Sequence, residues 1–233
     1  MNYSKIIKKL KSLKNQKNID GMARFGINPK NTLGISIYDL RKIAKEIGKD
    51  PSFAKASMGR HELALKLWDS GIHEAKILAS FIDEPDKVTD AQLEKWVLDF
   101  DSWDVVDQVS ELIAHTPFVA KKIFEWSERS EEFVKRSAFS LIAEVSWWDK
   151  KITDKEIEKF FPVIKKAATD ERNFVKKAVN WALRNIGKRN KKLNKKAIKV
   201  AKEIDKIDDK TSKWIAKDAL RELTSDKIQA RIK

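Results

Sequence analysis

An indole and a carboxylate stand four residues apart at Trp103 and Asp107, within the run 101–108 (DSWDVVDQ). If this run is helical, both side chains project from the same face, because residues at i and i+4 are neighbours on a helix surface. An indole face attracts a planar cation, and a carboxylate stabilises positive charge that develops beside it. We therefore expect this pair to hold a positively charged planar group and to stabilise charge next to it.

A simpler interpretation places Asp107 on an ordinary helix surface. Asp101, Asp104 and Asp107 would all interact favourably with the N-terminal end of a helix that starts near Trp103. This interpretation explains Asp101 and Asp104 well. It explains Asp107 less well, because Asp107 shares the face of Trp103.

The composition is typical of a helical globular chain. Of the 233 residues, 42% are hydrophobic and 36% are charged, with only 7 Gly and 5 Pro, which supports a core and disfavours disorder. The sequence has no Cys, and His61, His73 and His115 are not spaced as metal ligands, so we expect no metal and no other cofactor. The N-terminal residues lack a signal-peptide apolar region and no stretch has the length of a membrane span. We expect a cytoplasmic protein without a membrane partner.

The net charge of +14 lies entirely in the last third of the chain. Residues 150–233 hold 26 Lys and Arg against 12 Asp and Glu, whereas residues 1–149 hold 23 of each. A basic region joined to a neutral one indicates a polyanionic partner, most simply nucleic acid. The alternative is a Lys-rich solvated surface.

The densest basic segment is 188–199, which has seven Lys or Arg in twelve residues and no acid. Such a segment would bind a phosphate backbone without reading its sequence. We expect Lys188, Arg189, Lys191 and Lys192 to contact DNA, and a solvated loop between helices is the alternative.

Helix signals run along the chain, and strand signals are nearly absent. Ser36 and Asp39 look like a capping box, followed by apolar residues and a stop at Gly48. We expect about a dozen helices of roughly 8–18 residues, joined by short links.

Two internal similarities indicate a repeat of about 40 residues. Segment 133–138 (FVKRSA) resembles 174–179 (FVKKAV), and 181–186 (WALRNI) resembles 218–223 (DALREL), at shifts of 41 and 37 residues. Two helices and two turns take about this length, as in HEAT and armadillo arrays. We therefore expect one all-α domain over 1–233, a curved right-handed α-solenoid of HEAT-like helix pairs. An irregular helical bundle is the alternative.

In such a solenoid the second helix of each pair lines a concave surface. The expected second helices are 102–115, 132–146, 172–187 and 211–224. Trp103 and Asp107 fall on the first of these and Arg136 on the second. Trp181 and Arg184 share a face of the third, where they could contact a base and a phosphate, unless Trp181 belongs to the core.

The other tryptophans divide between core and surface. One of the consecutive residues Trp147 and Trp148 is expected to face outward. Apolar helical stripes predict that the following four lie in the core: Trp68, Trp96, Trp126 and Trp214.

A series of short motifs in a fixed order extends from about residue 20 to about residue 225. The motifs are Met22-Ala23-Arg24-Phe25, Leu33-Gly34-Ile35, Leu40-Arg41, Leu67-Trp68, Glu74-Ala75, Ser102-Trp103-Asp104, Asp107, Arg136 and Trp181-Ala182-Leu183-Arg184. In this order and spacing the chain resembles the DNA alkylation repair enzymes of the AlkD type, a group of HEAT-like-repeat DNA glycosylases. That family removes alkylated purines from DNA, chiefly bases made cationic by alkylation at N3 of adenine or N7 of guanine.

The resemblance implies roles for five residues. Asp107 would match the catalytic aspartate, and Trp103 and Trp181 would match the tryptophans that flank the lesion nucleotide. Arg136 and Arg184 would match arginines that hold the DNA backbone. The chain has Phe25 where relatives can have a tyrosine, which removes any hydroxyl contact at that position.

The chemistry of a cationic purine fits a site with one carboxylate. An alkylated purine cation is a good leaving group, so its N-glycosidic bond can break without a general acid. One anion then suffices to stabilise the oxocarbenium-like sugar and to orient water, unlike the two carboxylates of sugar hydrolases.

The expected function is therefore a monomeric DNA glycosylase that excises purines of the 3-methyladenine and 7-methylguanine type from double-stranded DNA, in base excision repair. The first alternative is a non-catalytic HEAT-like protein that recognises damaged or branched DNA. The second is a protein-interaction scaffold, the common use of helical solenoids. The basic C-terminal third argues against the scaffold.

Overall fold

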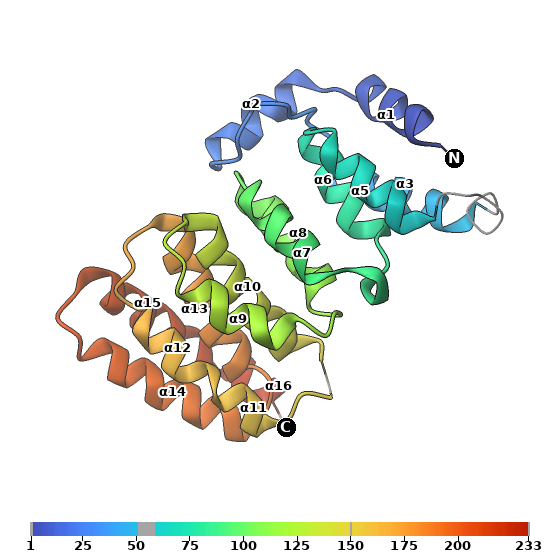
Figure 1. The fold of residues 1–233 in the computed structure, drawn as a ribbon. Helices are drawn as coiled ribbons and strands as arrows, with labels where there is room; N and C mark the ends of the chain where they lie inside the picture. Colours follow the sequence, from blue (N-terminus) through green and yellow to red (C-terminus); the bar gives the residue numbers. More distant parts are fainter. Residues whose placement is uncertain (1, 51–58, 150, 233) are drawn as a thin grey trace. The chain divides into compact units, whose positions relative to one another are not determined.

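The computed structural model describes residues 2–50, 59–149 and 151–232, and these residues form helices and connecting segments without a strand (Figure 1). The chain divides into two compact units, unit 1 (Met1–Thr116) and unit 2 (Pro117–Lys233). Each unit is described by itself. The expectation of a single domain over 1–233 stays a prediction.

Helix α6 is the centre of unit 1, because it packs against α3, α5 and α8. The helices of this unit are α1 (Tyr3–Ser12), α2 (Gln16–Arg24), α3 (Ile37–Lys49), α5 (Arg60–Asp69), α6 (His73–Ile82), the 3-10 helix η1 (Pro85–Lys87), α7 (Asp90–Leu98) and α8 (Trp103–Ile113). Trp68 and Trp96 stack in the core with ring centroids 4.0 Å apart. The indole N–H of Trp68 donates to Asp99 at 2.8 Å, so the buried polar atom is satisfied.

Helix α3 begins where the sequence predicts. The hydroxyl of Ser36 accepts the backbone N–H of Asp39 at 3.1 Å, and Leu40, Ile43 and Ile47 form the buried face. The expected stop at Gly48 is wrong by one residue, because the helix continues through Gly48 and ends at Lys49.

A buried carboxylate fixes the segment before α3. Glu74, in the first turn of α6, is fully buried and accepts the backbone N–H groups of Leu33, Gly34 and Ile35 at 2.6–3.2 Å. Gly34 has φ +76°, and a Cβ there would collide with the carbonyl oxygen of Asn15, so only glycine suits the position. This clamp holds the chain from α2 to α3 against the N-terminal end of α6.

Unit 2 consists of stacked helix pairs, in which α10 packs against α9 and α13, and α13 against α14 and α15. Its helices are α9 (Val119–Ser127), α10 (Glu132–Trp147), α11 (Asp154–Glu158), α12 (Phe160–Lys166), α13 (Asn173–Gly187), α14 (Lys191–Asp205), α15 (Lys210–Leu223) and α16 (Asp226–Arg231). The pairs α9–α10, α12–α13 and α14–α15 follow one another along the chain.

The repeat of about 40 residues is visible in the contacts between neighbouring pairs. The rings of Phe133 and Phe174 lie 5.4 Å apart, at equivalent positions of α10 and α13. The side-chain amide of Asn185 donates to the carbonyl of Ala143, 42 residues earlier, at 3.2 Å. The all-α fold of HEAT-like helix pairs is thereby confirmed, and the irregular bundle is excluded for these pairs.

The tryptophan predictions hold for three of the four residues assigned to the core. Trp68, Trp96 and Trp126 are buried, whereas Trp214 is 42% exposed, so its assignment to the core is wrong. Trp214 precedes Ile215 and Ala216 on α15, and these two residues belong to the buried face. Trp147 and Trp148 lie at the end of α10, and both are exposed, Trp148 more than Trp147.

Candidate nucleic-acid interface

Trp103 is the first residue of α8, and Asp107 lies one turn further along the same helix. Both side chains are half-buried, and their i, i+4 spacing places them on one face as expected. The indole Nε1 of Trp103 donates to the carbonyl oxygen of Phe25 at 3.0 Å. The Phe25 side chain itself is 74% exposed. The indole is therefore tied through its edge to the end of α2.

The other polar residues at the start of α8 have structural partners. The backbone N–H of Asn28 donates to the hydroxyl of Ser102 at 2.9 Å, and its side-chain amide donates to Asp101 at 2.8 Å. Asp104 is buried and pairs with His73 at 2.9 Å. Asp101 and Asp104 thus help to hold the loop after α2 and the start of α6 against α8.

The buried His73 favours its charged form. Burial acts against the imidazolium, but the hydrogen bond and charge of Asp104, together with the charges of Glu74 and Asp101, raise the pKa of His73 above its ordinary value. The backbone N–H of His73 also donates to the carbonyl of Asn31. Asp104, the residue that follows Trp103, therefore forms a buried ion pair with His73.

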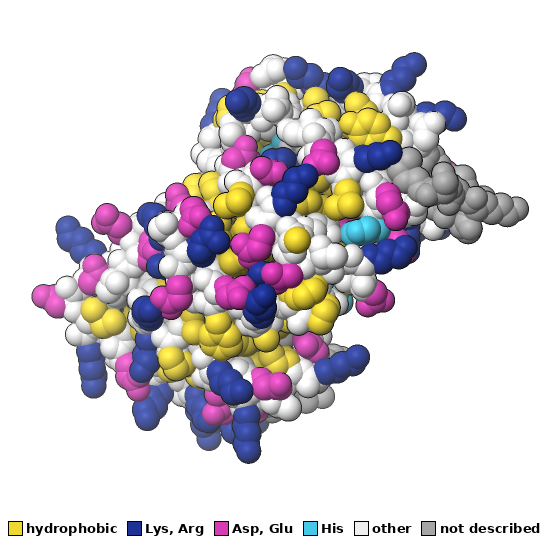
Figure 2. Space-filling view, viewed as in Figure 1, with side chains coloured by type: hydrophobic (Ala, Val, Ile, Leu, Met, Phe, Trp, Pro, Cys, Tyr) yellow, Lys and Arg dark blue, Asp and Glu magenta, His cyan; other side chains and the backbone are white. Residues whose placement is uncertain are grey.

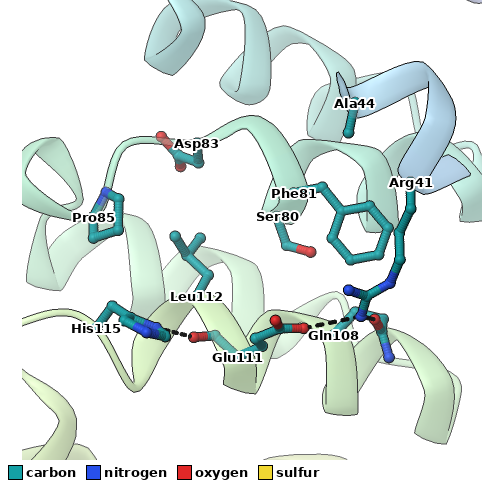
Figure 3. A pocket seen from close by; sticks show the side chains of 10 residues that line it. All are labelled: Arg41, Ala44, Ser80, Phe81, Asp83, Pro85, Gln108, Glu111, Leu112 and His115. Carbon is teal, nitrogen blue, oxygen red and sulfur yellow. Dashed lines mark hydrogen bonds and ion pairs between the residues drawn. The ribbon is translucent and has the colours of Figure 1, made fainter. Parts of the chain in front are cut away.

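A cavity of about 460 Å³ lies in unit 1 between α3, α6 and α8, and its lining includes Gln108 and Glu111 of α8 (Figure 3). Arg41 of α3 lies over the ring of Phe81, with its guanidinium carbon 4.9 Å from the ring centroid. It donates to Gln108 at 3.2 Å and to Glu111 at 3.1 Å. Gln108 directly follows Asp107, and Glu111 lies one turn beyond it. The structure thus holds the Arg41 guanidinium against two residues of α8 that are neighbours of Asp107 along that helix.

Arg41 belongs to the motif Leu40-Arg41, but the sequence alone predicts no role for its side chain. The available signal was a basic residue directly after the buried Leu40 of a capped helix, which is too common to select one arginine.

In unit 2, Trp181, Arg184 and Lys188 share a face of α13. Arg184 pairs with Glu222 of α15 at 2.5 Å, and Lys188 reaches the same carboxylate at 3.1 Å. Asp218 lies 3.6 Å from Arg184. Burial raises the pKa of Glu222, but the charges of these two cations outweigh it and hold the pKa below its usual range. A phosphate that binds Arg184 or Lys188 must therefore compete with α15 carboxylates.

Arg136 lies inside unit 2. Only 6% of its surface is exposed, and its guanidinium donates to the carbonyl of Phe174 at 2.8 Å. This contact joins α10 to the N-terminal end of α13. The expected contact between Arg136 and the DNA backbone stays a prediction.

The basic segment 188–199 is mostly helical, so the loop interpretation is wrong for the part that lies in α14. Arg189 donates to the carbonyls of Ser146 and Ile152 and closes the end of α10. Lys192 is exposed and lies 3.8–3.9 Å from two carboxylates, and Lys191 is exposed at the first turn of the helix. Figure 2 shows Lys and Arg side chains gathered along the lower edge of unit 2, where α14 runs in Figure 1.

Trp181 also lines a cavity that sequence reasoning missed. The cavity has a volume of about 290 Å³ and is here named the tryptophan pocket. It is lined by Glu144, Trp147, Trp148, Trp181, Asn185 and Lys188. The 41-residue repeat could have located it, since that shift places the end of α10 beside the second half of α13.

The expected site residues are thus divided between the two units. Trp103 and Asp107 belong to unit 1, whereas Trp181, Arg136 and Arg184 belong to unit 2. The approach of Trp181 to Asp107 stays a prediction. Among residues 2–50, 59–149 and 151–232, no cluster of His, Asp and Glu is arranged to hold a metal ion. In the same residues no helix is both long and apolar enough to cross a membrane.

Comparison with known proteins gives a family and a fold. A sequence profile of the family described as DNA alkylation repair enzyme matches residues 6–223. A solved structure from a new family of proteins related to the HEAT-like repeat DNA glycosylases, with affinity for branched DNA structures, superposes with a TM-score of 0.75 at 17% identity and covers 95% of both chains. A designed armadillo repeat protein reaches a TM-score of 0.40 at 17% identity, over 80% of this chain and 91% of its own. No curated protein matches the chain.

Proposed function

Because the chain belongs to the DNA alkylation repair enzyme family, we propose that it is a DNA glycosylase that excises cationic alkylated purines from double-stranded DNA. Its substrates are of the 3-methyladenine and 7-methylguanine type, and the reaction is hydrolysis of the N-glycosidic bond. The observation that carries the proposal is the placement of Trp103 and Asp107 one turn apart on α8, with the indole anchored to the carbonyl of Phe25.

The proposed reaction needs one anion and one water. When the bond between C1′ and the base nitrogen breaks, its electron pair neutralises the cationic purine, and the sugar acquires oxocarbenium character. The Asp107 carboxylate stabilises that charge, and water adds to C1′ and gives up its proton to the same carboxylate. The face of Trp103 stabilises the bound cation by about 0.5–2 kcal/mol, according to how far it is desolvated.

Duplex binding is proposed to use the basic side chains of unit 2. Arg184 and Lys188 share Glu222 as a partner, and each can exchange this carboxylate for a phosphate of similar charge and geometry. Lys191 and Lys192 present exposed ammonium groups at the start of α14.

The test is Asp107→Asn on a duplex that contains 7-methylguanine. We expect free-base release to fall at least about 100-fold, because a neutral amide stabilises the oxocarbenium poorly. DNA binding, measured by gel retardation, should be retained. Asp101→Asn is the matched control, since Asp101 precedes the same helix and an amide can still accept from Asn28. Equal base release by wild type and Asp107→Asn would remove Asp107 from the mechanism.

A second candidate is a non-catalytic protein that binds branched or damaged DNA. It is favoured by the affinity for branched DNA stated for the structural relative with a TM-score of 0.75. Incubation with alkylated duplex, plain duplex and a four-way junction separates the two functions. Base release from the alkylated duplex supports the glycosylase. Junction retardation without base release supports the second candidate.

A further inference from the structure

The solvent side of α14 carries a row of lysines, here named the outer lysine row. With about 3.6 residues per turn, its members project within an arc of about 60°, on the side of α14 opposite to the buried face. They are Lys195, Lys199, Lys202 and Lys206, and all four are exposed. The buried face consists of Leu193, Ala197, Val200, Ala201 and Ile204. Lys191, one turn before Lys195, lies on the same side but belongs to the proposed duplex contact.

Carboxylates neutralise the lysines beside this row but not the row itself. Lys192 and Lys196 both reach Glu158, at 3.8 Å and 2.5 Å. Glu203 of α14 is paired with Lys165 of α12 at 3.0 Å. Within residues 2–50, 59–149 and 151–232, by contrast, the outer lysine row forms no ion pair with a carboxylate. The row therefore presents four uncompensated positive charges along one line.

Glu203 lies at the border of the row without neutralising it. The hydrogen bond from Lys165 lowers the pKa of Glu203, and the charges of Lys165, Lys199 and Lys206 lower it further. Because Lys165 already holds this carboxylate, the two lysines of the row act on it only from a greater distance.

The row points away from the helices that carry the proposed duplex contact. The buried face of α14 packs against α13 and α15, and a Cβ on Gly187 of α13 would meet the methyl group of Ala197. Arg184 and Lys188 lie on α13 and pair with Glu222 of α15. The ammonium groups on the opposite side of α14 therefore extend away from Arg184 and Lys188.

The charge balance of the chain agrees with a second use of this region. Residues 150–233 hold 26 Lys and Arg against 12 Asp and Glu, and the proposed duplex contact uses only a few of these cations. Figure 2 shows Lys and Arg side chains gathered along the lower edge of unit 2, where α14 runs in Figure 1. A cluster of like charges opposes folding and is favourable only when a polyanion neutralises it.

Among polyanions, duplex DNA fits the row best. From Lys195 to Lys206 the helix rises about 17 Å, which matches about five base pairs at about 3.4 Å each. Lysine binds a phosphate as a point charge and does not read the bases. A membrane surface or a protein partner would need an apolar face, and no large apolar side chain of α14 is exposed.

We propose that the outer lysine row holds a second segment of duplex DNA while α13 holds the first, so that one protein molecule bridges two DNA segments. The second segment is bound through its phosphates, without regard to sequence or alkylation. The choice of DNA as the polyanion rests on the proposed function, whereas bridging requires neither Asp107 nor bond cleavage.

The test is capture of a second duplex. Protein is bound to a short immobilised duplex, unbound protein is washed away, and a labelled plain duplex is added. We expect wild type to retain the labelled duplex. The combined variant Lys195→Gln, Lys199→Gln and Lys202→Gln should retain it at least about tenfold more weakly, and the salt-dependence slope of this step should fall by about three units. Base release from an alkylated duplex should be unchanged.

The matched control removes three exposed lysines of unit 2 that are already paired with carboxylates, so the net charge changes equally. It combines Lys121→Gln, Lys166→Gln and Lys213→Gln, whose partners are Glu125, Glu128 and Asp208. We expect the control to capture the second duplex as wild type does. Thermal unfolding followed by circular dichroism checks that both triple variants are folded.

Several outcomes would overturn the inference. Wild type that captures no second duplex would do so, as would equal capture by wild type and the outer-row variant, or equal losses in the two triple variants. Weaker binding of the first duplex without any capture of a second would assign the row to the first duplex. Vesicles of phosphatidylcholine and phosphatidylserine form a further arm, and row-dependent binding to them without duplex capture would assign the row to a membrane surface.

Failure of this inference can be told apart from failure of the proposed function. Base release without capture that depends on the outer lysine row would refute only the second DNA surface. Row-dependent capture by a protein that releases no base would refute only the glycosylase.

Discussion

The indole N–H of Trp103 and the carbonyl oxygen of Phe25 form a hydrogen bond of 3.0 Å between residues 78 positions apart. The bond fixes the plane of the indole at the start of α8, one turn before Asp107. It also makes the orientation of Trp103 depend on the chain segment after α2. The segment is held in turn by Asn28, which donates to Ser102 and Asp101.

Trp103→Phe keeps an aromatic ring and removes the N–H. We expect unfolding to be easier by about 1 kcal/mol, which is the usual net contribution of one hydrogen bond. Base release should fall severalfold, because the ring is no longer fixed and is a weaker partner for a cation. Urea unfolding and base release measure the two effects. Trp214→Phe, which removes an exposed indole elsewhere, should change neither.

Glu74→Gln tests the clamp on the loop before α3. The fully buried carboxylate accepts three backbone N–H groups, whereas an amide offers one oxygen and a donor that has no acceptor there. We expect a loss of about 2–3 kcal/mol in unfolding free energy. Glu46→Gln is the control, because Glu46 forms an exposed pair with Lys9 and should cost less than about 1 kcal/mol. Equal losses would show that the clamp adds nothing.

Arg184→Ala is expected to weaken binding to duplexes of every sequence and to lower the salt-dependence slope by about one unit. The reason is the loss of one phosphate contact. The variant also leaves Glu222 with only Lys188, so stability should be measured alongside. Arg60→Ala in unit 1 removes an exposed arginine that pairs with Glu84 and serves as the control. A salt slope that Arg184→Ala leaves unchanged would exclude the phosphate contact.

The pair of His73 and Asp104 predicts a dependence of stability on pH. Burial opposes the charge on His73, but the partners Asp104, Glu74 and Asp101 raise its pKa in the folded state above the unfolded value. Protonation therefore favours folding, and the contribution is complete below the unfolded pKa and is lost as pH rises through the folded pKa. The stability advantage of wild type over His73→Asn should stay constant below the ordinary histidine pKa of 6.5 and shrink over the pH range above it. An advantage that stays constant over this range would contradict the pairing.

The repeat and most of the core could be predicted from sequence, because both depend on local periodicity. Phe133 and Phe174 occupy equivalent positions in two segments of similar sequence, and they meet in the structure. Trp68 and Trp96 follow from the apolar stripes of their helices. The exposure of Trp214 could not be predicted, because a short apolar stripe does not distinguish a position on the buried face of a helix from the position next to it.

The surroundings of the charged site residues could not be predicted in the same way. Arg136 was assigned to DNA by motif, yet its guanidinium reaches a carbonyl inside unit 2. The pairing of Arg184 with Glu222 depends on which helix lies beside α13, and that is a property of stacking. The 37-residue shift did hold a signal, because it places Glu222 next to the position equivalent to Arg184.

Hydrogen bonds between α10 and α13 join residues about one repeat apart, 38 to 42 positions, and this spacing bears on how the length of such a chain can change in evolution. Each helix pair packs against its neighbours through similar contacts, so a complete helix pair is one structural repeat unit. If one whole repeat unit were gained or lost, every remaining helix pair would still have a neighbouring pair to pack against. An insertion of any other length within a helix would displace the residues that contact the neighbouring helix pair. We expect length variation in unit 2 to occur in whole repeat units or in the turns between helices.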